Sequence, residues 1–290
     1  MNKTRCVLIT GASGFIGSAL VDHFSTKGWN VIAAQRSTPL SVSSRVRFAK
    51  YDMKESFDPT LLNGVDCIIH AAYIKSDAKN SNAYELNLRS ATEILAASRK
   101  SEVSKNIFIS SMSAQPDAVS VYGKQKFAIE KLFNESKDAI VRPGLVIGNG
   151  GLVKNLCRMF RAGRFVPLIG GGEQPLQIIQ INELVNSIEL IIEKDLKGRL
   201  TLAHPEVYSF RTFYKTLGEC IGKRPVFFSV PYIFPLMFIR FARLLNLPLG
   251  ITEDNLRGLQ KMRAVDTKPD LKKIGAELSD LKTALSKTKL

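Results

Sequence analysis

The most constraining feature of the sequence is a loop of regularly spaced glycines near its start. Gly11, Gly14 and Gly17 follow an apolar run at residues 6–10, and a segment of helical periodicity that ends at Gly28 comes next. This order of buried strand, glycine turn and helix is the G-x-x-G-x-x-G variant of the dinucleotide-binding fingerprint. Three glycines alone would also fit a structural turn. Their place between a strand and a helix favours nucleotide binding, because the first N–H groups of the helix are free to hold a pyrophosphate.

Strands and helices alternate along the chain at βαβ spacing beyond this loop. Apolar runs predict strands at residues 6–10, 30–34, 46–49, 65–70, 106–111 and 139–142. Helical spacing predicts helices after the glycine loop, from about residue 84 to 100, and from 124 to 134. The strand runs are continuously apolar, which is typical of strands buried on both faces of a parallel sheet. The sequence therefore predicts an α/β fold, a Rossmann-type doubly wound parallel sheet.

The regular alternation loosens after about Gly148. Glycine and proline cluster between residues 163 and 175, and a strand at 176–181 and a helix at 183–192 follow. We expect an NAD(P)-binding domain over residues 1–150, to which residues 176–203 return. Residues 151–175 and 204–290 would form a small, mostly helical lobe, and the substrate would bind between the two parts.

The charge and the cysteine content limit the classes of partner. The 290 residues include 41 lysines and arginines against 26 acidic residues, a net charge of +15, which favours anionic partners. Nucleic acid is not expected, because no binding motif is present and aromatic residues do not interleave with the basic ones. The cysteines and histidines are too widely spaced for a metal site or a disulfide scaffold. The chain has neither a cleavable signal nor an apolar run of about 18 residues, so we expect a cytoplasmic protein without a transmembrane span.

The end of the second expected strand bears on the choice of cofactor. A site for NAD usually places Asp or Glu there, against the ribose 2′-OH. Here the residues are Gln35, Arg36 and Ser37. A guanidinium can pair with a 2′-phosphate through two hydrogen bonds. Arg36 therefore favours NADP(H) over NAD(H), with a solvated surface arginine as the alternative.

A tyrosine and a lysine four residues apart follow the fifth expected strand. Tyr122 and Lys126 share a helix face, and an ammonium beside a phenol lowers the phenol pKa because it favours the phenolate. Such a tyrosine can exchange a proton with a substrate oxygen near neutral pH. The strand itself ends in serines whose hydroxyls can bond the same oxygen. We therefore predict a catalytic group of Ser111, Tyr122 and Lys126, with Ser113 as the alternative serine.

Several motifs occur in a fixed order: TGASGFIG at residues 10–17, HAA at 70–72, SS at 110–111, YGKQK at 122–126 and RPG at 142–144. Together they resemble the extended or atypical short-chain dehydrogenases/reductases. The closer resemblance is to the NAD-dependent epimerase/dehydratase family, which acts on nucleotide sugars. It covers about the first 200 residues well and the tail more loosely. It implies a Rossmann fold and an NAD(P)-dependent oxidoreductase or epimerase with a nucleotide-sugar substrate.

The resemblance also implies roles for individual residues. Tyr122 would be the acid/base, Lys126 would bind the nicotinamide ribose and tune Tyr122, and Ser111 would orient the substrate oxygen. Asp52 would lie near the adenine and Pro143 near the nicotinamide. The complete set of expected cofactor-binding residues is Gly11, Ser13, Gly14, Phe15, Ile16, Gly17, Arg36, Asp52, Met53, Ala71, Ala72, Lys75, Asn87, Tyr122, Lys126 and Pro143.

Two departures from the family pattern reduce the number of reactions that we expect. The loop between Ser111 and Tyr122 is shorter than extended members usually show. Dehydratases of the family place an Asp-Glu pair after the catalytic hydroxyl, where this chain has Met112 and Ser113, so we do not expect water elimination. We expect the reduction of a 4-keto sugar nucleotide. One alternative is a UDP-sugar 4-epimerase with tightly bound NAD. Another is a non-catalytic NADPH-binding protein that resembles the accessory subunit of complex I.

Basic residues recur at helical spacing just beyond the sheet domain. They are Lys154, Arg158, Arg161 and Arg164. Lys154 and Arg158 are candidates for binding the substrate diphosphate, although a solvated cationic face would show the same spacing. The long helices of the sheet domain are expected to pair in a homodimer.

A strongly apolar segment lies in the tail. It spans residues 226–239, and Arg240 and Arg243 follow directly. We interpret this segment as the core of the small lobe. The alternative is an interfacial membrane element with basic anchors.

Overall fold

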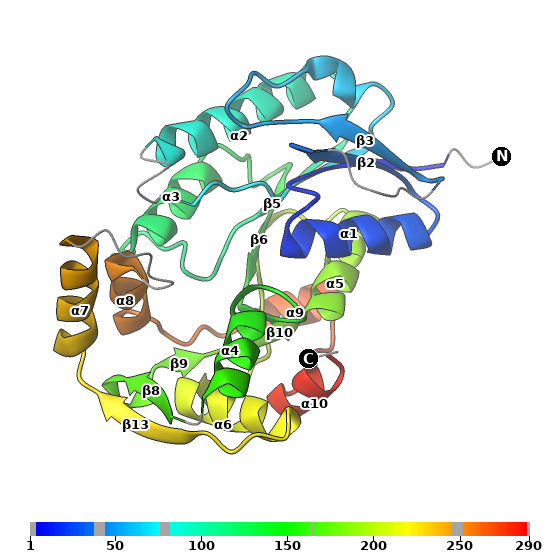
Figure 1. Ribbon diagram of the computed structural model, residues 1–290. Helices are drawn as coiled ribbons and strands as arrows, with labels where there is room; N and C mark the ends of the chain where they lie inside the picture. The colour runs from blue at the N-terminus through cyan, green and yellow to red at the C-terminus, as the bar shows by residue number, and fades with distance from the viewer. Residues whose placement is uncertain (1–3, 38–43, 76–81, 164, 245–251, 289–290) are drawn as a thin grey trace.

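The computed structural model describes residues 4–37, 44–75, 82–163, 165–244 and 252–288, and between residues 238 and 244 it describes the side chain of Ile239 alone. A seven-stranded, fully parallel sheet forms its centre (Figure 1). The strands follow the order β11 (Gly198–Leu202), β6 (Ala139–Pro143), β5 (Lys105–Ile109), β4 (Cys67–His70), β1 (Cys6–Thr10), β2 (Asn30–Gln35) and β3 (Val46–Lys50). The strand order reverses between β1 and β4, where such sheets form a ligand crevice. The predicted doubly wound fold is confirmed.

Helices cover both faces of the sheet because its strands present apolar side chains in both directions. The helices are α1 (Phe15–Thr26), α2 (Ala83–Arg99), α3 (Val121–Glu130) and α5 (Ile181–Glu193), with a short 3₁₀ helix, η1 (Pro59–Leu62). Val7 and Ile9 of β1 belong to the core that α1 and α5 cover. Leu8 belongs to the opposite core, together with Ile94 of α2. Burying one such side chain contributes roughly 1.5–3 kcal/mol, so these two layers hold the sheet together.

The helix that carries the tyrosine–lysine pair begins earlier than predicted. It was expected over residues 124–134 and instead runs from Val121 to Glu130. The Ser120 hydroxyl accepts a hydrogen bond from the Gly123 N–H at 3.1 Å and caps the first turn. Tyr122 therefore lies within that first turn, close to backbone N–H groups that have no partner inside the helix.

The predicted strand at 176–181 divides into two short strands outside the large sheet. These are β9 (Pro175–Leu176) and β10 (Ile178–Gln180). The chain joins the large sheet only after α5, where β11 pairs with β6 from Gly198 to Leu202.

The remaining elements form a smaller lobe, which lies below the sheet in Figure 1. Its helices are α4 (Gly151–Ala162), α6 (Phe210–Cys220), α7 (Ile233–Leu244), α8 (Glu253–Gln260) and α10 (Leu281–Ser286), with a 3₁₀ helix, η2 (Gly170–Gly172), while α9 (Lys268–Ile274) packs on β11. Its strands pair as β7 (Leu145–Ile147) with β10, β9 with β12 (Tyr208–Ser209), and β8 (Phe165–Ile169) with β13 (Val226–Val230). Phe160, Phe213, Leu217 and Leu285 are buried in its core.

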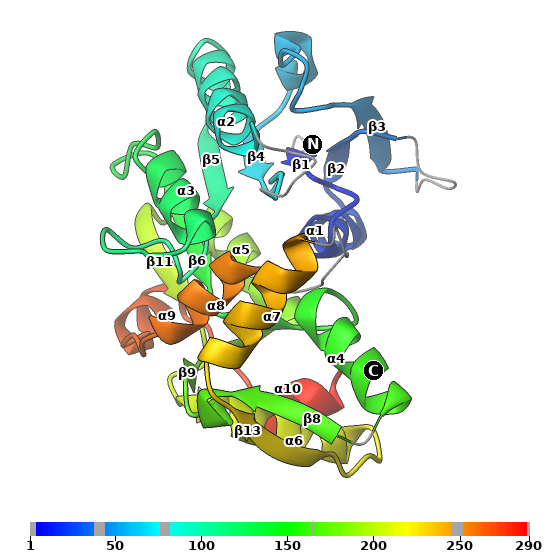
Figure 2. The same ribbon diagram turned by 60° about the vertical axis from the view of Figure 1, so that its left-hand side comes forward.

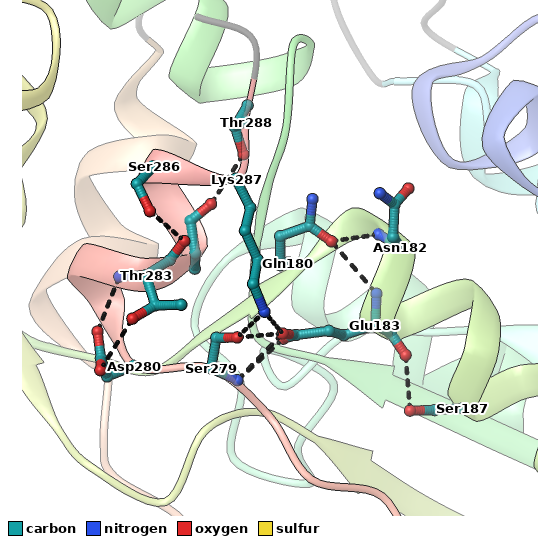
Figure 3. A network of polar contacts seen from close by, with 11 residues as sticks. Gln180, Asn182, Glu183, Ser187, Ser279, Asp280, Thr283, Ser286, Lys287 and Thr288 are labelled. Atoms are coloured by element: carbon teal, nitrogen blue, oxygen red, sulfur yellow. Dashed lines mark hydrogen bonds and ion pairs between the residues drawn. The ribbon is translucent and has the colours of Figure 1, made fainter.

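The carboxylate of Glu183 ties the end of the chain to the start of α5 (Figure 3). It accepts hydrogen bonds from the Ser279 N–H at 3.1 Å and from the Ser279 hydroxyl at 2.5 Å, and Lys287 Nζ lies 3.7 Å away. Gln180 caps the same helix by accepting the Asn182 N–H at 2.5 Å. An acidic side chain in the first turn also suits the positive end of a helix. These contacts hold α10 and the loop before it against the sheet domain.

The prediction that residues 226–239 form the core of the small lobe is wrong. Ile233, Phe234 and Met237 are 55%, 60% and 60% exposed. Side chains of α4, α6 and α10 fill that core, and from β13 Phe227 packs against it. Figure 2 shows α7 in front of the molecule beside α8, with β8 and β13 below them. The side chains of Arg240 and Arg243 lie outside the description, as does Arg164.

No helix in the described ranges is both long and apolar enough to cross a membrane.

Candidate active site

The glycine loop closes tightly between β1 and α1. Gly11 has a φ of +68°, and its carbonyl oxygen accepts the Gly14 N–H at 2.9 Å. A Cβ at Gly17 would lie 2.0 Å from that oxygen, and one at Gly11 would lie 2.8 Å from the backbone of Ala72. Among the described residues no side chain caps α1 at Gly14. The loop therefore has the narrow cradle and the open helix N-terminus that fit the pyrophosphate of a dinucleotide.

Of the other candidate residues in this loop, some are exposed to solvent and others pack against neighbouring elements. Ser13 and Gly14 are exposed at its tip. The Phe15 ring lies against the turn after β7, where a Cβ at Gly150 would come within 2.2 Å of it. Ile16 packs against the main core. Phe15 thus links the glycine loop to the start of α4.

His70 holds the end of β4 to β1. Its Nδ1 lies 2.8 Å from Thr10 Oγ1, which also accepts the Ala72 N–H at 3.2 Å. Burial, with a smaller effect of the Lys126 charge, lowers the pKa of His70 to about 3, so the ring is neutral. Ala71 and Ala72 consequently lie directly beside the glycine loop. In the described ranges no cluster of His, Cys, Asp and Glu could bind a metal.

The remaining cofactor candidates follow the carboxyl ends of β2, β3 and β4. Arg36 is exposed just after β2, Asp52 is half-buried and Met53 is buried after β3, and Lys75 is exposed after β4. The Asn87 side chain bonds both the N–H and the carbonyl oxygen of Ile74 at 2.8 Å. Asn87 therefore fixes the loop after β4, which the resemblance alone did not indicate.

Tyr122 is paired with Ser111. The Ser111 hydroxyl lies beside the phenol and acts to lower its pKa, and Ser111 Oγ accepts the Ser113 N–H at 3.1 Å. Ser113 itself is exposed. Burial raises the pKa of Tyr122, and the neighbouring Ser111 hydroxyl offsets only part of that effect. The expected lowering of the phenol pKa by Lys126 is therefore not found; burial determines the direction.

Lys126 is buried, with 4% of its surface exposed. Its ammonium donates to the Ile109 carbonyl oxygen at 2.8 Å and lies 4.5 and 4.7 Å from the ring centres of Tyr73 and Phe108. Burial lowers its pKa to about 7, although the charge of Glu130 acts in the opposite direction. The ring of Tyr73 meets that of Tyr122 edge-on, with centres 5.3 Å apart. Tyr73, an aromatic side chain that the sequence did not single out, thus contacts both the lysine and the tyrosine.

The sequence also gave no sign of the part that Glu130 plays beneath the site. Its buried carboxylate accepts a hydrogen bond from the Ser110 hydroxyl at 2.5 Å and two from Arg142 at 2.8 and 2.5 Å. Glu130 lies one helical turn after Lys126 on α3. The sequence places Glu130 four residues after Lys126 on one helix, and this spacing was the only signal that could have revealed its role. The partner Arg142 comes from another element, so no local pattern links the two.

A cavity of about 560 Å³ opens beside Ser111. Its walls combine the loop from Ser111 to Ser120, the β6–β7 connection and the chain after α8. The lining includes three of the predicted site residues, Ser111, Ser113 and Pro143. It also includes Gln177, Lys261 and Arg263, which were not predicted. Lys154 and Arg158 are exposed on α4 and are not among the lining residues.

The small lobe contacts the start of α3 and the loop before it through two acidic side chains. Asp254, in the first turn of α8, accepts the Val121 N–H at 2.5 Å and the Tyr122 N–H at 3.2 Å. Arg263 donates to both carboxylate oxygens of Asp117, at 3.1 and 2.7 Å. The first contact satisfies N–H groups that the helix leaves free. The tail therefore closes one side of the cavity and fixes the turn that carries Tyr122.

We expect Asp254→Ala to loosen the start of α3, because alanine has no side-chain oxygen to accept the Val121 and Tyr122 N–H groups. The free energy of unfolding should fall by about 0.5–2 kcal/mol, the range for losing a helix cap. Hydrogen exchange of the Val121 and Tyr122 amides should accelerate. The control is Asp280→Ala, which removes a side-chain cap from α10 instead. Equal exchange at these two amides in both variants would refute the contact.

The buried lysine makes stability depend on pH in a defined direction. The pKa of Lys126 is about 7 in the folded protein and 10.5 as an ordinary lysine, so the unfolded chain binds the additional proton between these values. The free energy of unfolding should therefore gain a contribution as pH rises through this window. Lys126→Met removes that contribution. Urea denaturation at several pH values in this window should show the free energy of unfolding rising more with pH for wild type than for Lys126→Met. The control Lys137→Met, at an exposed site, should show the same pH dependence as wild type. If the free energies of unfolding of Lys126→Met and wild type differ by the same amount at every pH, the pKa shift of Lys126 is contradicted.

The chain is similar to enzymes named for the reduction or epimerisation of diphosphate-linked sugars. It is 22% identical to a dTDP-4-dehydro-6-deoxy-D-allose reductase of Streptomyces bikiniensis, over 76% of this chain and 82% of the relative. It is 23% identical to an N-acetyl-alpha-D-glucosaminyl-diphospho-ditrans,octacis-undecaprenol 4-epimerase of Escherichia coli O157:H7, over 70% of this chain and 66% of the relative.

Solved structures share its fold at low sequence identity. MoeE5 in complex with UDP-glucuronic acid and NAD superposes with a TM-score of 0.76 at 20% identity, covering 97% of each chain. UDP-glucose 4-epimerase from Thermotoga maritima superposes with a TM-score of 0.75 at 21% identity, covering 97% of this chain and 96% of that one. The profile of the NAD dependent epimerase/dehydratase family matches residues 7–203. Because that match spans more than half of its length, the chain belongs to the NAD dependent epimerase/dehydratase family and is an NAD(P)-dependent oxidoreductase or epimerase.

Proposed function

We propose that this protein reduces the keto group of a 4-keto sugar nucleotide with NADPH. One observation carries the proposal: Ser111, whose hydroxyl lies beside the Tyr122 phenol, lines a cavity of about 560 Å³ that is large enough for a small-molecule substrate. The similarity to a dTDP-4-keto-sugar reductase, over most of both chains, supports this reaction.

The residues around the glycine loop would hold the cofactor. Its pyrophosphate fits the N-terminus of α1 at Ser13 and Gly14, and its adenine half would extend toward Arg36 and Asp52. Ala71, Ala72, Asn87 and Lys75 would border its middle, and Pro143 its nicotinamide end. When bound, the cofactor supplies the hydride.

Tyr122 suits the role of proton donor. Its raised pKa keeps the phenol protonated at neutral pH, and a protonated phenol can give its proton to the oxygen of a ketone undergoing reduction. Ser111 lies beside that phenol and lines the cavity, so its hydroxyl can orient the same oxygen. Lys126 would hold the nicotinamide ribose from the next turn of the helix.

Positive charge on the far wall of the cavity suits a diphosphate. Lys261 and Arg263 belong to that wall, and Arg263 is already held in place by Asp117. We assign the substrate diphosphate to these two residues in preference to Lys154 and Arg158, which are exposed on α4.

A 4-epimerase is the second candidate, because several structural neighbours and one relative carry that name. An epimerase oxidises and then reduces the same carbon, so it retains its cofactor. The protein should be denatured after purification and the released dinucleotide measured. A stoichiometric amount of NAD would favour epimerisation, and little or none would favour the reductase.

The non-catalytic alternative is supported by a 23% identity to an NADH dehydrogenase subunit of Arabidopsis thaliana, over 77% of this chain and 60% of the relative. A scaffold has no chemical need for a serine, a tyrosine and a lysine in one site. NADPH binding without turnover of any keto sugar nucleotide in a panel would favour this alternative.

We expect Tyr122→Phe to lower turnover at least about 100-fold, since it removes the proton donor. Dinucleotide affinity should change little, because the ring and its packing remain. NADPH oxidation with dTDP- and UDP-keto sugars measures the first quantity and fluorescence titration the second. Tyr84→Phe, at an exposed position on α2, is the control. Substantial turnover by Tyr122→Phe would rule out this tyrosine as the acid.

We expect Arg36→Ala to weaken NADPH binding about tenfold and to leave NADH binding nearly unchanged, because the guanidinium would contact only the 2′-phosphate. Arg47→Ala, exposed on the neighbouring β3, controls for the general loss of positive charge. Isothermal titration with both dinucleotides measures the four affinities. An equal loss for NADPH and NADH would contradict the assignment.

A further inference from the structure

The ribbon of β8 and β13 presents one apolar surface to solvent. The two strands are parallel, with Val226 opposite Phe165 and Phe228 opposite Pro167. Phe165, Val226 and Phe228 are 71%, 39% and 47% exposed. The intervening residues Val166 and Leu168 are buried. The alternation is that of a strand with one side on the lobe and the other side open.

Helix α7, which begins at Ile233 soon after β13, carries further exposed apolar side chains. Ile233 and Met237 are four residues apart and share a helix side, with Phe234 adjoining them. All three are more than half exposed. We refer to Phe165, Val226, Phe228, Ile233, Phe234 and Met237 as the apolar face. It holds six of the eleven exposed large hydrophobic side chains of the described residues, so the exposure is concentrated in one part of the fold.

Basic side chains lie at one end of this face. Arg161 precedes β8, and Lys223 and Arg224 precede β13; because the strands run in parallel and in register, all three belong to the same end of the ribbon. All are exposed, and within the described part of the chain none of the three has an ion-pair partner. The nearest acid in the sequence is Glu219 on α6.

We propose that the apolar face binds the surface of an anionic lipid bilayer. Large aliphatic and aromatic side chains enter the headgroup–acyl boundary, and neighbouring lysines and arginines gain from anionic headgroups. A second copy of the chain is a poorer occupant, because each copy carries a net charge of +15. The contact is peripheral, and it does not depend on the reaction proposed above.

The test is co-sedimentation of the full chain with vesicles. Wild type should bind vesicles of phosphatidylglycerol and phosphatidylcholine at low salt and release them as salt rises. The triple variant Ile233→Ser, Phe234→Ser, Met237→Ser should bind at least about tenfold more weakly. Lys223→Glu with Arg224→Glu should also weaken binding and flatten the salt dependence. Tyr84→Ser with Val207→Ser, which removes exposed apolar groups elsewhere, should bind like wild type.

Any one of the following results would overturn the proposal. The first is no binding of wild type to anionic vesicles at low salt. The second is equal binding by wild type and the triple variant, or equal binding to vesicles of phosphatidylcholine alone. The third is a dimer in sedimentation equilibrium that the triple variant abolishes while vesicles remain unbound. Thermal unfolding of every variant checks that loss of binding reflects the surface and not the fold.

Discussion

The buried carboxylate of Glu130 is the interaction on which the geometry of the site depends. It binds Ser110 and Arg142, the residues immediately before Ser111 and Pro143, and it lies one turn from Lys126. One charge thereby connects β5, β6 and α3 at the point where the cavity begins. Breaking a buried ion pair costs about 3–5 kcal/mol, because the remaining charge is left uncompensated. The positions of the serine, the proline and the lysine are therefore coupled to one another.

The small lobe contributes residues to the candidate site that the sheet domain begins. Asp254 and Arg263 come from the last fifth of the chain, yet they contact the start of α3 and the loop before it. The carboxylate of Asp254 also brings negative charge to a helix N-terminus, where it is favourable. Because Lys261 and Arg263 line the cavity, the segment that closes the site also determines its charge.

The sequence predicted those parts of the fold that local patterns encode. Buried strands such as residues 6–10, and glycines whose spacing permits one loop, identify the sheet and the family. The Ser111–Tyr122 pair was also predictable, because both residues belong to local motifs. The contact of Asp254 with Val121 spans 133 residues, and no local pattern reports it. The apolar segment 226–239 was assigned to the core because hydrophobicity alone does not distinguish a buried strand from an exposed one.

The pKa of Tyr122 is raised, whereas the sequence predicted that Lys126 would lower it. The prediction rested on a rule for one pair of residues and did not include their surroundings in the fold. The rule treats the lysine as a fixed positive charge beside the phenol. In the folded protein Lys126 is itself desolvated, and a pKa of about 7 leaves it only partly charged at neutral pH. Its ammonium is directed to the Ile109 carbonyl oxygen and the rings of Tyr73 and Phe108. A weakened and diverted charge cannot offset the burial of the phenol, so the phenol keeps its proton, which is the state that a reduction requires.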